Sequence, residues 1–341
     1  MDRGRRIRVL VVDDSAFFRQ LLSQGLASDP ELEIVAVARD AFDAREKIDR
    51  YDPDVMTCDI EMPKMDGIEF IKRLMPEQPL PVIVVSGIND AVFEALKAGA
   101  VDFVAKPAAG SDQAVDVFIA DMITKVKIAA QANVLPGRKS VTVKKAKKKG
   151  IDIIAIGAST GGTEAIHSVL TELPPTVPGI VIVQHIPAVF SRMFAERLDR
   201  STRFQVSEAK SGAEIKKGQV LVAPGGQHLT IKKVGSGYGY QAECFQGAKV
   251  NGHCPSVDVL FESVAAEAGE RAVGIILTGM GSDGAKGMLS LRKKGARTIG
   301  QDEESAVIYG MPKAAFNLDA VEVQASLPEI PRLVSSLLDI K

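Results

Sequence analysis

The chain of 341 residues is 46% hydrophobic and 25% charged, a composition typical of globular proteins, and its length suggests two domains. This composition excludes a collagen-like, coiled-coil or largely disordered chain. The 42 lysines and arginines balance 43 acidic residues, and the formal net charge of −1 gives no general basicity that would favour nucleic acid or an acidic membrane surface.

No segment of the sequence predicts secretion or membrane insertion. The apolar run 9–12 after the N-terminal arginines is too short for a signal peptide, and no stretch approaches the roughly 18 apolar residues of a membrane span. Three widely spaced cysteines without a Cys-x-x-Cys pair indicate reduced thiols rather than disulfides or a structural metal. We therefore expect a cytoplasmic protein.

Short apolar runs alternate with amphipathic segments along the chain, which is the pattern of parallel sheets with crossover helices. In the first half we expect strands at residues 8–12, 54–58, 81–85 and 101–105, and helices at 16–27, 41–50, 67–74 and 91–98. Ligands of such sheets bind beyond the carboxyl ends of the strands. The residues that directly follow each strand are therefore the candidates for function.

Acidic residues, a hydroxyl and a lysine follow these four strands, in the order Asp13 and Asp14, Asp59, Ser86, and Lys106. Converging carboxylates repel one another unless a cation lies among them, and oxygen ligands suit Mg²⁺. A carboxylate can also attack phosphorus, and a lysine and a hydroxyl would stabilise the resulting aspartyl phosphate. A single Asp in such a position is more often a helix cap, so the combination is what favours this hypothesis.

Residues 7–124 resemble the response-regulator receiver family in these strand-end residues, in Lys106-Pro107 and in the run Asp59-x-Glu61-Met62-Pro63-x-Met65-Asp66-Gly67. The resemblance implies a flavodoxin-like receiver domain with Asp59 as the phospho-acceptor. It implies Mg²⁺ bound by Asp13, Asp14, Asp59 and the carbonyl of Glu61. It also implies roles in switching for Ser86, Lys106 and Phe103, the last as the reporting aromatic.

A basic segment separates the two halves of the chain. Residues 125–149 contain nine lysines or arginines and no acid, so the rest of the chain carries a net charge of −10. Because like charges repel and Pro136-Gly137 interrupts the segment, we expect an extended or loosely helical linker over residues 125–150. A nucleic-acid-binding tail is less favoured, since no aromatic residues that could stack on bases lie between the charges.

In the second half we expect strands at residues 152–156, 179–183 and 272–277. Ser159 and His185 follow the first two strands, and Asp283 lies just past the third. These are the parts of an acyl-transfer triad, which geometry defines and not chain order. Ser159 lies in Gly-x-Ser-x-Gly form, whose small residues permit the sharp turn that exposes a nucleophile. The N–H of Thr160 would point from a helix N-terminus towards the developing oxyanion.

The general base can be sought among four histidines, of which only His185 ends an apolar strand. His167 lies within a helix expected at residues 164–170, whereas His228 and His253 lie in turn regions where they could line the rim of a site. An imidazole with an unperturbed pKa near ~6.5 can accept a serine proton at neutral pH. His185 is therefore the predicted base.

The run Gly279-x-Gly281-x-x-Gly284 supports two hypotheses. After a strand and before a helix it is a dinucleotide-binding fingerprint, with Asp302 about 20 residues further on. Against this, the run lies late in its domain and leaves the serine and the histidine unexplained. In the triad hypothesis Asp283 orients the imidazole and stabilises its protonated form. The alternatives to an esterase are a dinucleotide-binding oxidoreductase and a non-catalytic receiver protein that binds a partner or acts as a phosphate sink.

Receiver, linker and second domain in this order resemble the CheB family of chemotaxis protein-glutamate methylesterases. The resemblance covers nearly the whole chain, including Gln184-His185-x-Pro187, Ala223-Pro224-Gly225-Gly226-x-His228, Tyr309-Gly310-Met311-Pro312 and residues 157–162, 255–261 and 277–284. One departure is Cys254, where we expect a basic residue. The resemblance implies an α/β chain of two doubly wound parallel-sheet domains, with a receiver at residues 1–124 and a Rossmann-like methylesterase domain at 151–341.

In that family the substrates are glutamate methyl esters on the cytoplasmic region of chemoreceptors, and related members also deamidate glutamine there. The resemblance implies Ser159 as nucleophile, His185 as general base and Asp283 as its orienting residue, with the amides of Thr160 and Met280 as the oxyanion hole. It implies no cofactor for the ester chemistry. A chemotaxis histidine kinase would supply the phosphoryl group to Asp59, and we expect this phosphorylation to control the esterase.

Overall fold

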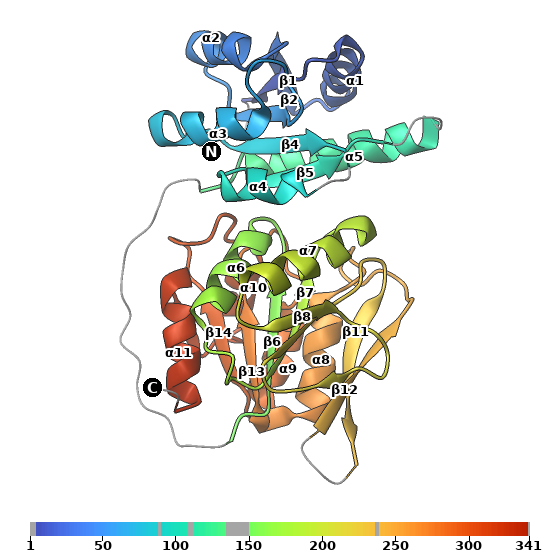
Figure 1. Cartoon of the computed structure of the whole chain (residues 1–341), viewed down its shortest axis with the longest axis vertical. Coiled ribbons are helices and arrows are strands. Elements are labelled where there is room, and N and C mark those ends of the chain that lie inside the picture. Colours follow the sequence, from blue (N-terminus) through green and yellow to red (C-terminus); the bar gives the residue numbers. More distant parts are fainter. Residues whose placement is uncertain (1–4, 88–89, 108–111, 134–149, 236–238, 340–341) are drawn as a thin grey trace. The chain divides into compact units, whose positions relative to one another are not determined.

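The chain divides into two units, residues 1–135 and 136–341 (Figure 1). The computed structural model describes residues 5–87, 90–107, 112–133, 150–235 and 239–339. Residues 134–149, most of the expected linker, lie outside the described residues. Each unit is built around its own parallel sheet.

The N-terminal unit has a five-stranded sheet in the order β2-β1-β3-β4-β5, the flavodoxin-like order, and all its pairings are parallel. The strands are β1 (Ile7–Val12), β2 (Leu32–Ala38), β3 (Val55–Asp59), β4 (Val82–Ser86) and β5 (Asp102–Ala105). Every residue of β3 and β4 is buried, which explains their continuous apolar runs. The sequence analysis missed β2, an edge strand whose five central residues are only partly buried.

Five helices surround this sheet: α1 (Ala16–Ala27), α2 (Ala41–Tyr51), α3 (Gly67–Glu77), α4 (Ala91–Lys97) and α5 (Asp112–Ala129). The first three helices are capped by the side chains of Ser15, Asp40 and Asp66, respectively. Each of these side chains accepts a hydrogen bond from a backbone N–H in the first turn of its helix. α5 continues beyond residue 124, so the first residues of the expected linker are α-helical. Lys125 and Lys127 there form ion pairs with Asp102 and Asp29, so these two charges are balanced by carboxylates.

The C-terminal unit has a seven-stranded parallel sheet in the order β15-β14-β13-β6-β7-β10-β8. Its strands are β6 (Ile153–Ala158), β7 (Gly179–Gln184), β8 (Gln205–Glu208), β10 (Gln219–Val222), β13 (Ala272–Ile276), β14 (Arg297–Gln301) and β15 (Val323–Ala325). A second sheet, which the sequence analysis did not predict, is antiparallel in the order β11-β12-β9. Its strands are β9 (Glu214–Ile215), β11 (His228–Val234) and β12 (Gly239–Phe245).

The helices of this unit are α6 (Gly162–Glu172), α7 (Ala188–Ser201), α8 (Val257–Glu267), α9 (Ala285–Lys293), α10 (Met311–Asn317) and α11 (Ile330–Leu337), with 3₁₀ turns η1 (Gly269–Arg271) and η2 (Leu327–Glu329). Buried side chains of α8, α9 and α10 share one core with β6, β7, β11 and β12. α6 contacts both α7 and α11. Helices with apolar faces therefore bury the sheet, as a doubly wound fold requires.

The order of strands explains where a site forms. The chain passes from β6 to its neighbour β7, and later returns to place β13 on the opposite side of β6. In open α/β sheets, ligands bind beyond the carboxyl ends of the strands at such a reversal. The segments after β6, β7 and β13, which carry the predicted triad, therefore meet at one edge of the sheet.

Candidate active site

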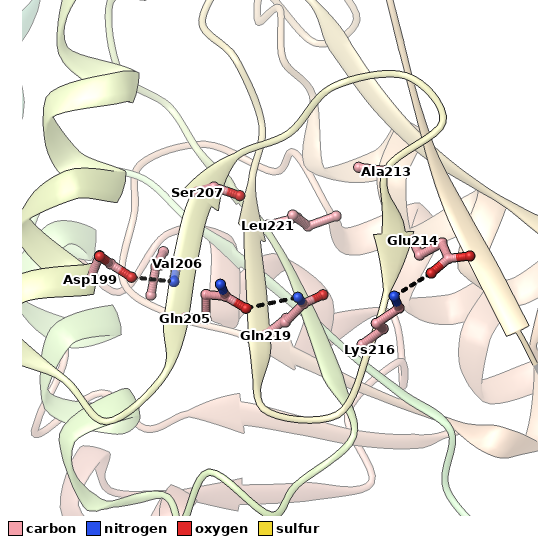
Figure 2. Close-up of a pocket in the computed structure, with 9 residues that line it drawn as sticks. All are labelled: Asp199, Gln205, Val206, Ser207, Ala213, Glu214, Lys216, Gln219 and Leu221. Carbon is pink, nitrogen blue, oxygen red and sulfur yellow. Dashed lines mark hydrogen bonds and ion pairs between the residues drawn. The ribbon is translucent and has the colours of Figure 1, made fainter.

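A pocket of 440 Å³ lies at the β8 side of the second unit, between β8, β10 and β9 (Figure 2). Four of its polar side chains form two pairs: Gln219 donates to Gln205 at 2.9 Å, and Lys216 lies 2.5 Å from Glu214. None of the residues predicted from sequence lines it. The pocket therefore does not coincide with the predicted chemistry.

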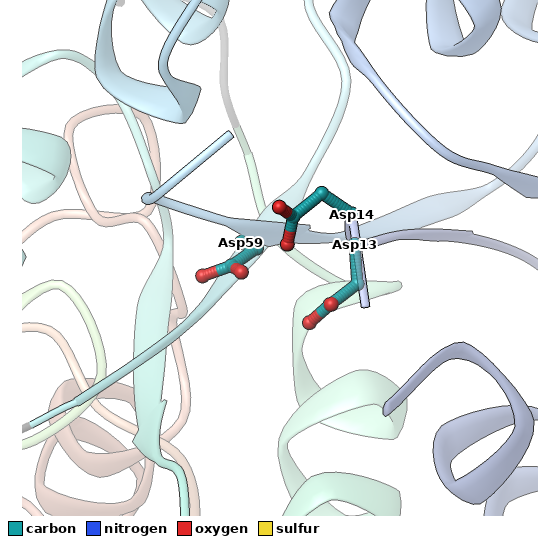
Figure 3. A group of neighbouring side chains, drawn as sticks. All are labelled: Asp13, Asp14 and Asp59. Carbon is teal, nitrogen blue, oxygen red and sulfur yellow. The ribbon is translucent and has the colours of Figure 1, made fainter. Parts of the chain in front are cut away.

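Three carboxylates gather at the switch point of the first sheet (Figure 3). Asp13, Asp14 and Asp59 each offer an oxygen within 4.8 Å of the others, and the first and third are buried. Two follow β1 and one ends the adjacent β3, so the order of the strands brings them together. An all-oxygen set with a high density of negative charge is the kind of donor set that Mg²⁺ prefers.

Lys106 lies beside this acidic cluster. Its ammonium is 2.6 Å from Asp59 Oδ2 and 3.0 Å from Asp13 Oδ2. Burial raises the pKa of Asp59, a shift that the hydrogen bond from Lys106 opposes and the charge of Asp13 reinforces. The lysine pKa is raised despite its own burial, because both carboxylates accept its protons. The ammonium is thus held charged next to the expected phospho-acceptor.

The remaining predicted receiver residues lie around the same edge. Ser86 is buried, and its hydroxyl has no hydrogen-bond partner among the described residues. Phe103 is also buried, with the Lys125 ammonium 5.1 Å from its ring centre. The backbone N–H of Glu61 donates to Asp59 at 3.3 Å. The proposed role of the Glu61 carbonyl as a metal ligand stays a prediction.

In the second unit, the turn after β6 carries Ser159 into α6. The Ser159 N–H donates to the carbonyl of Thr278 at 2.9 Å, which ties this turn to the segment after β13. Gly161 then adopts a φ of +75°, and a Cβ there would lie 2.7 Å from Val307. Only glycine fits that left-handed, crowded position, so the small residues around the serine serve the sharp turn that the motif predicts.

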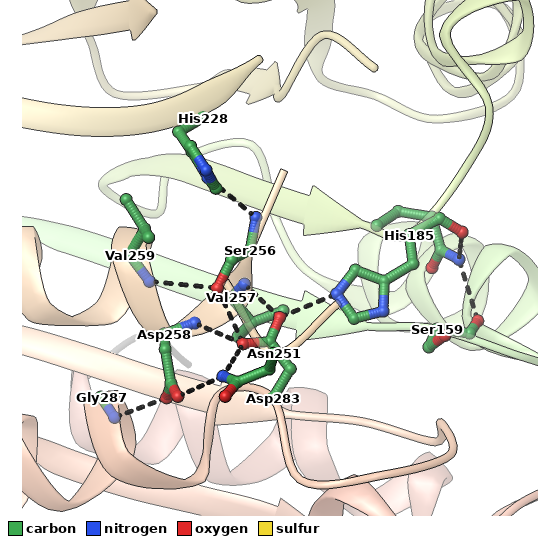
Figure 4. A network of polar contacts seen from close by, with 11 residues as sticks. Ser159, His185, His228, Asn251, Ser256, Val257, Asp258, Val259, Asp283 and Gly287 are labelled. Carbon is green, nitrogen blue, oxygen red and sulfur yellow. Dashed lines mark hydrogen bonds and ion pairs between the residues drawn. The ribbon is translucent and has the colours of Figure 1, made fainter. Parts of the chain in front are cut away.

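The histidine and the aspartate of the predicted triad form a hydrogen bond. His185 directly follows β7, and its backbone N–H donates to the carbonyl of Ala158 at the end of β6. Its imidazole Nε2 lies 2.9 Å from Asp283 Oδ2 (Figure 4). Both side chains are buried, with relative exposures of 7% and 1%. The contact joins residues 98 positions apart in the chain.

Asp283 is held by donors on both of its oxygens. Oδ1 accepts from the Ser256 hydroxyl (2.7 Å), the Asn251 amide (2.8 Å) and the Asp258 N–H (3.3 Å). Oδ2 accepts from the Val257 N–H at 2.7 Å as well as from the imidazole. Burial alone would raise the pKa of Asp283, but these hydrogen bonds hold it well below its usual value. The N-terminus of α8 adds a favourable dipole.

The hydrogen bond to Asp283 determines which imidazole nitrogen can act as the base. A carboxylate accepts, so Nε2 carries the proton and Nδ1 keeps its lone pair. His185 Nδ1 is buried and has no hydrogen-bond partner among the described residues. The Ser159 turn lies beside this ring, but no hydrogen bond joins its hydroxyl to Nδ1 within the described part of the chain (Figure 4). Such contacts often tighten only when substrate binds.

The loop after β13 places the second predicted oxyanion donor. The Gly279 carbonyl accepts from the N–H groups of Gly310 (3.1 Å) and Met311 (2.7 Å). In a trans peptide the N–H points opposite to the C=O. The Met280 N–H therefore points away from those two donors. A Cβ on Gly279 would lie 2.6 Å from the Ser159 Cβ, so this loop packs directly against the serine.

A second imidazole, that of His253, lies at this site, and the sequence analysis had considered this residue only as a possible rim residue. His253 stacks on the imidazole of His185, with ring centres 3.6 Å apart and an angle of 6° between the planes. The turn that places it has positive φ at Asn251 and Gly252, an Asn-Gly pattern that strongly predicts a tight hairpin turn. Burial, and then the neighbouring His185, lower the pKa of His253 to about 4. The sequence spacing did not indicate that His253 would stack on His185.

Two other residues have structural roles. His228, considered above as a rim residue, is instead 2% exposed, and its ring bonds to the Ala248 carbonyl and the Ser256 N–H. That expectation was wrong because β11 inserts its first side chain beneath α8. Asp302, the candidate ribose ligand of the nucleotide hypothesis, accepts hydrogen bonds from the N–H and hydroxyl of Ser305 and closes a local turn.

The described residues include no helix of the length and apolarity needed to cross a membrane.

Family models match both units of the chain. The family model "CheB methylesterase" matches residues 154–334, and that of the "Response regulator receiver domain" matches residues 9–117. The chain is 53% identical to "Protein-glutamate methylesterase/protein-glutamine glutaminase 2" of Syntrophomonas wolfei, over 99% of both chains. It is 48% identical to the protein-glutamate methylesterase/protein-glutamine glutaminase of Syntrophotalea carbinolica, over 98% of both chains.

A solved structure resembles the second unit. The catalytic domain of the CheB methylesterase of Thermotoga maritima aligns with a TM-score of 0.53 and 33% sequence identity. The alignment covers all of that domain and 55% of the present chain. The similarity thus extends from the sequence motifs to the three-dimensional arrangement of the second unit.

Proposed function

The chain belongs to the CheB methylesterase family, with a response-regulator receiver domain before the esterase domain, and we propose that it hydrolyses glutamate methyl esters on chemoreceptors under the control of phosphorylation. The products are a glutamate side chain and methanol. The observation that carries this proposal is the hydrogen bond of 2.9 Å between His185 and Asp283 beside the Ser159 turn. Neither a binding module nor a dinucleotide site requires that pair.

In the proposed acylation step, Ser159 Oγ attacks the ester carbonyl while its proton passes to His185 Nδ1, the nitrogen whose lone pair Asp283 leaves available. The carbonyl oxygen becomes negative, and the N–H groups of Thr160 and Met280 stabilise it. The C–O bond to the methoxy group then breaks, and the imidazolium returns its proton to that oxygen, so methanol leaves. A glutamyl ester of Ser159 remains.

Deacylation repeats these steps with water. His185 Nδ1 takes a proton from the water molecule, whose oxygen attacks the acyl carbon, and the collapsing intermediate returns the serine with its proton. Asp283 stays ionised throughout, because five donors stabilise its charged form. The same residues would hydrolyse a glutamine side chain, with ammonia in place of methanol as the leaving group. We include this glutaminase activity in the proposal.

In the receiver, we propose that Asp59 accepts a phosphoryl group from a chemotaxis histidine kinase. Mg²⁺, when bound, would neutralise phosphoryl oxygens, and Asp13, Asp14 and Asp59 would hold it. The Lys106 ammonium, 2.6 Å from Asp59, would pair with the new charge, and the Ser86 hydroxyl, which no described residue engages, would donate to it. We propose the cytoplasm as the place of action, since the expected substrate and phosphodonor meet there.

The proposal is tested by methanol release from the methylated signalling region of a chemoreceptor. We expect the wild-type chain to release methanol and Ser159→Ala to release none above the uncatalysed rate. Ser263→Ala is the matched control, because this α8 hydroxyl accepts a hydrogen bond from Ile231 and lies outside the triad. Unchanged hydrolysis by Ser159→Ala would overturn the assignment of the nucleophile.

A second readout separates the esterase from the two alternative functions. A serine-directed organophosphonate should add to the tryptic peptide that contains Ser159 and to no other serine peptide. A non-catalytic receiver protein would show no addition at all. A dinucleotide-dependent oxidoreductase would instead show a thermal shift with a nicotinamide cofactor, which we do not expect.

A further inference from the structure

We infer that Gln184 is a positioning residue for the esterase, and that its side-chain amide holds the backbone of the nucleophile and of the general base in one arrangement. Gln184 is the last residue of β7, in register with Ala158 at the end of β6. The residue is 3% exposed. This inference rests on the proposed function and adds a residue that touches neither substrate nor the reacting atoms.

The amide of Gln184 bridges the two segments that carry the chemistry. Its Nε2 donates to the carbonyl of Ser159 at 2.9 Å and to the carbonyl of His185 at 3.1 Å. These carbonyls belong to turns after two different strands. One side chain therefore ties the turn of the nucleophile to the turn of the base.

This tie fixes the direction of an oxyanion donor. The Ser159 carbonyl also accepts from the Gly162 N–H at 2.7 Å, so two donors define its direction. Because the peptide is planar and trans, the Thr160 N–H must point the opposite way. The Gly279 carbonyl, which precedes the other proposed donor, is likewise held by two N–H groups. Both proposed oxyanion donors thus belong to peptide groups whose carbonyl oxygens each accept two hydrogen bonds, and these bonds fix the direction of the N–H.

The cost of burying this amide indicates that its donors are needed. Its Oε1 is buried and has no hydrogen-bond partner among the described residues. An unsatisfied buried acceptor costs about 1–3 kcal/mol, and an apolar side chain of the same length would avoid that cost. A flipped amide would place Oε1 against two carbonyl oxygens, so the observed orientation is the favourable one. A Cβ on Gly162 would lie 2.2 Å from Oε1, so a glycine there makes room for the amide.

The test compares Gln184→Met, which keeps the length and removes both donors, with Thr298→Val. Thr298 is fully buried in β14 and accepts a hydrogen bond from the Glu322 N–H, so its variant also loses a hydrogen bond made by a buried side chain. We expect kcat for methyl-ester hydrolysis to fall about 10- to 100-fold in Gln184→Met, with KM within about twofold of the wild type. Thr298→Val should keep wild-type kcat and show a similar change in thermal midpoint.

A boronic acid reports on the oxyanion site directly. Boron accepts the Ser159 oxygen while the serine proton passes to His185, and an oxygen on boron occupies the oxyanion position. We expect the inhibition constant to rise in Gln184→Met by about the factor by which kcat falls. A role in folding alone would leave both kcat and this constant unchanged in the folded protein, and that result would overturn the inference.

Two further variants keep the test decisive. If Gln184→Met does not fold, Gln184→Glu keeps the shape of the side chain and replaces the donating NH₂ group by an oxygen, so it should show the same loss of kcat. Wild-type kcat in that variant would overturn the inference. Ser159→Ala distinguishes failure of the proposed function from failure of this inference. If Ser159→Ala hydrolyses the ester, the proposed function is wrong. If Ser159→Ala is inactive and Gln184→Met is fully active, only the role of Gln184 is wrong.

Discussion

At the scale of single residues, the environment of each ionisable group decides its role. Asp283 and Asp302 follow neighbouring strands of the same sheet, and the sequence offered both as candidates. The first accepts five hydrogen bonds and faces an imidazole, whereas the second closes a turn through Ser305. A buried carboxylate surrounded by donors stays ionised and can stabilise a protonated histidine. Partners therefore distinguish the two aspartates, although their residue type is the same.

The contrast between the two aspartates predicts different effects of the same substitution. Asp283→Asn should lower kcat for ester hydrolysis by about 10³- to 10⁴-fold, because the amide no longer selects the required tautomer of His185. It should also cost about 1–3 kcal/mol of stability, since one carboxylate oxygen becomes an NH₂ group and a buried donor loses its acceptor. Asp302→Asn should retain wild-type kcat. Methanol release and urea unfolding of both variants measure these effects, and equal kcat values in the two variants would contradict the triad.

The stacked His253 makes the stability of the second unit depend on pH. The unfolded chain takes up this proton near pH ~6.5, whereas the folded chain does so only at about pH 4. The unfolded state therefore binds more protons between these values, and stability falls as the pH falls from 6.5 to 4. In His253→Phe, which keeps a ring, we expect a smaller loss over this window. Urea unfolding followed by circular dichroism measures the free energy of unfolding at each pH. If stability depends on pH equally in the wild type and in His253→Phe, His253 is not the group responsible.

At the scale of elements, turns after strands place the chemistry, and close packing sets their positions. The segment after β13 touches the segment after β6, because Gly279 lies against Ser159. The N-terminus of α8 supplies donors to Asp283 from Ser256, Val257 and Asp258. Strand ends alone would leave these groups free to move. Contacts between neighbouring turns supply the precision that acyl transfer requires.

A substitution in one of these turns tests this dependence. In Gly279→Ala the new Cβ would lie 2.6 Å from the Ser159 Cβ, so the turn of the nucleophile must shift. We expect kcat to fall by at least about 10²-fold, because a displacement near 1 Å is enough for such a loss. Gly212→Ala is the control, since this glycine has a φ of +84° with open space around it. It should lose about 1–2 kcal/mol of stability and keep its activity, and a similar kcat in both variants would refute the packing argument.

At the scale of the whole molecule, two doubly wound units carry two chemistries at corresponding places. Each sheet has a reversal in strand order, between β1 and β3 in the first and between β6 and β13 in the second. The acidic cluster lies at one reversal and the predicted triad residues at the other. The rule that ligands gather at such reversals applies to both units. Regulation then requires that phosphorylation of the first unit change the activity of the second.

This requirement gives a prediction for the complete chain. With acetyl phosphate and Mg²⁺, methanol release should rise in the wild type, and a tenfold rise corresponds to about 1.4 kcal/mol of differential stabilisation of the active state. Asp59→Asn should keep its unstimulated rate and lose the rise, because no phospho-acceptor remains. Chelation of Mg²⁺ should abolish the rise in the wild type and leave the rate of Asp59→Asn unchanged. A wild-type rate that ignores the phosphodonor would discard phosphorylation control and leave the esterase intact.

Much of this protein is determined by local sequence. Buried parallel strands are continuous apolar runs, so β1, β3, β4, β6 and β7 were predicted to within about two residues, and the side chain after each strand was identifiable by position. The edge strand β2 and the antiparallel sheet were not predicted, because partly buried strands lack continuous apolar runs and depend on their partner strands. The tertiary structure alone decided that Nε2 of His185 faces Asp283, that His253 stacks on that ring and that Gln184 bridges two turns. These are contacts between segments far apart in the chain, and they depend on packing that no local pattern encodes.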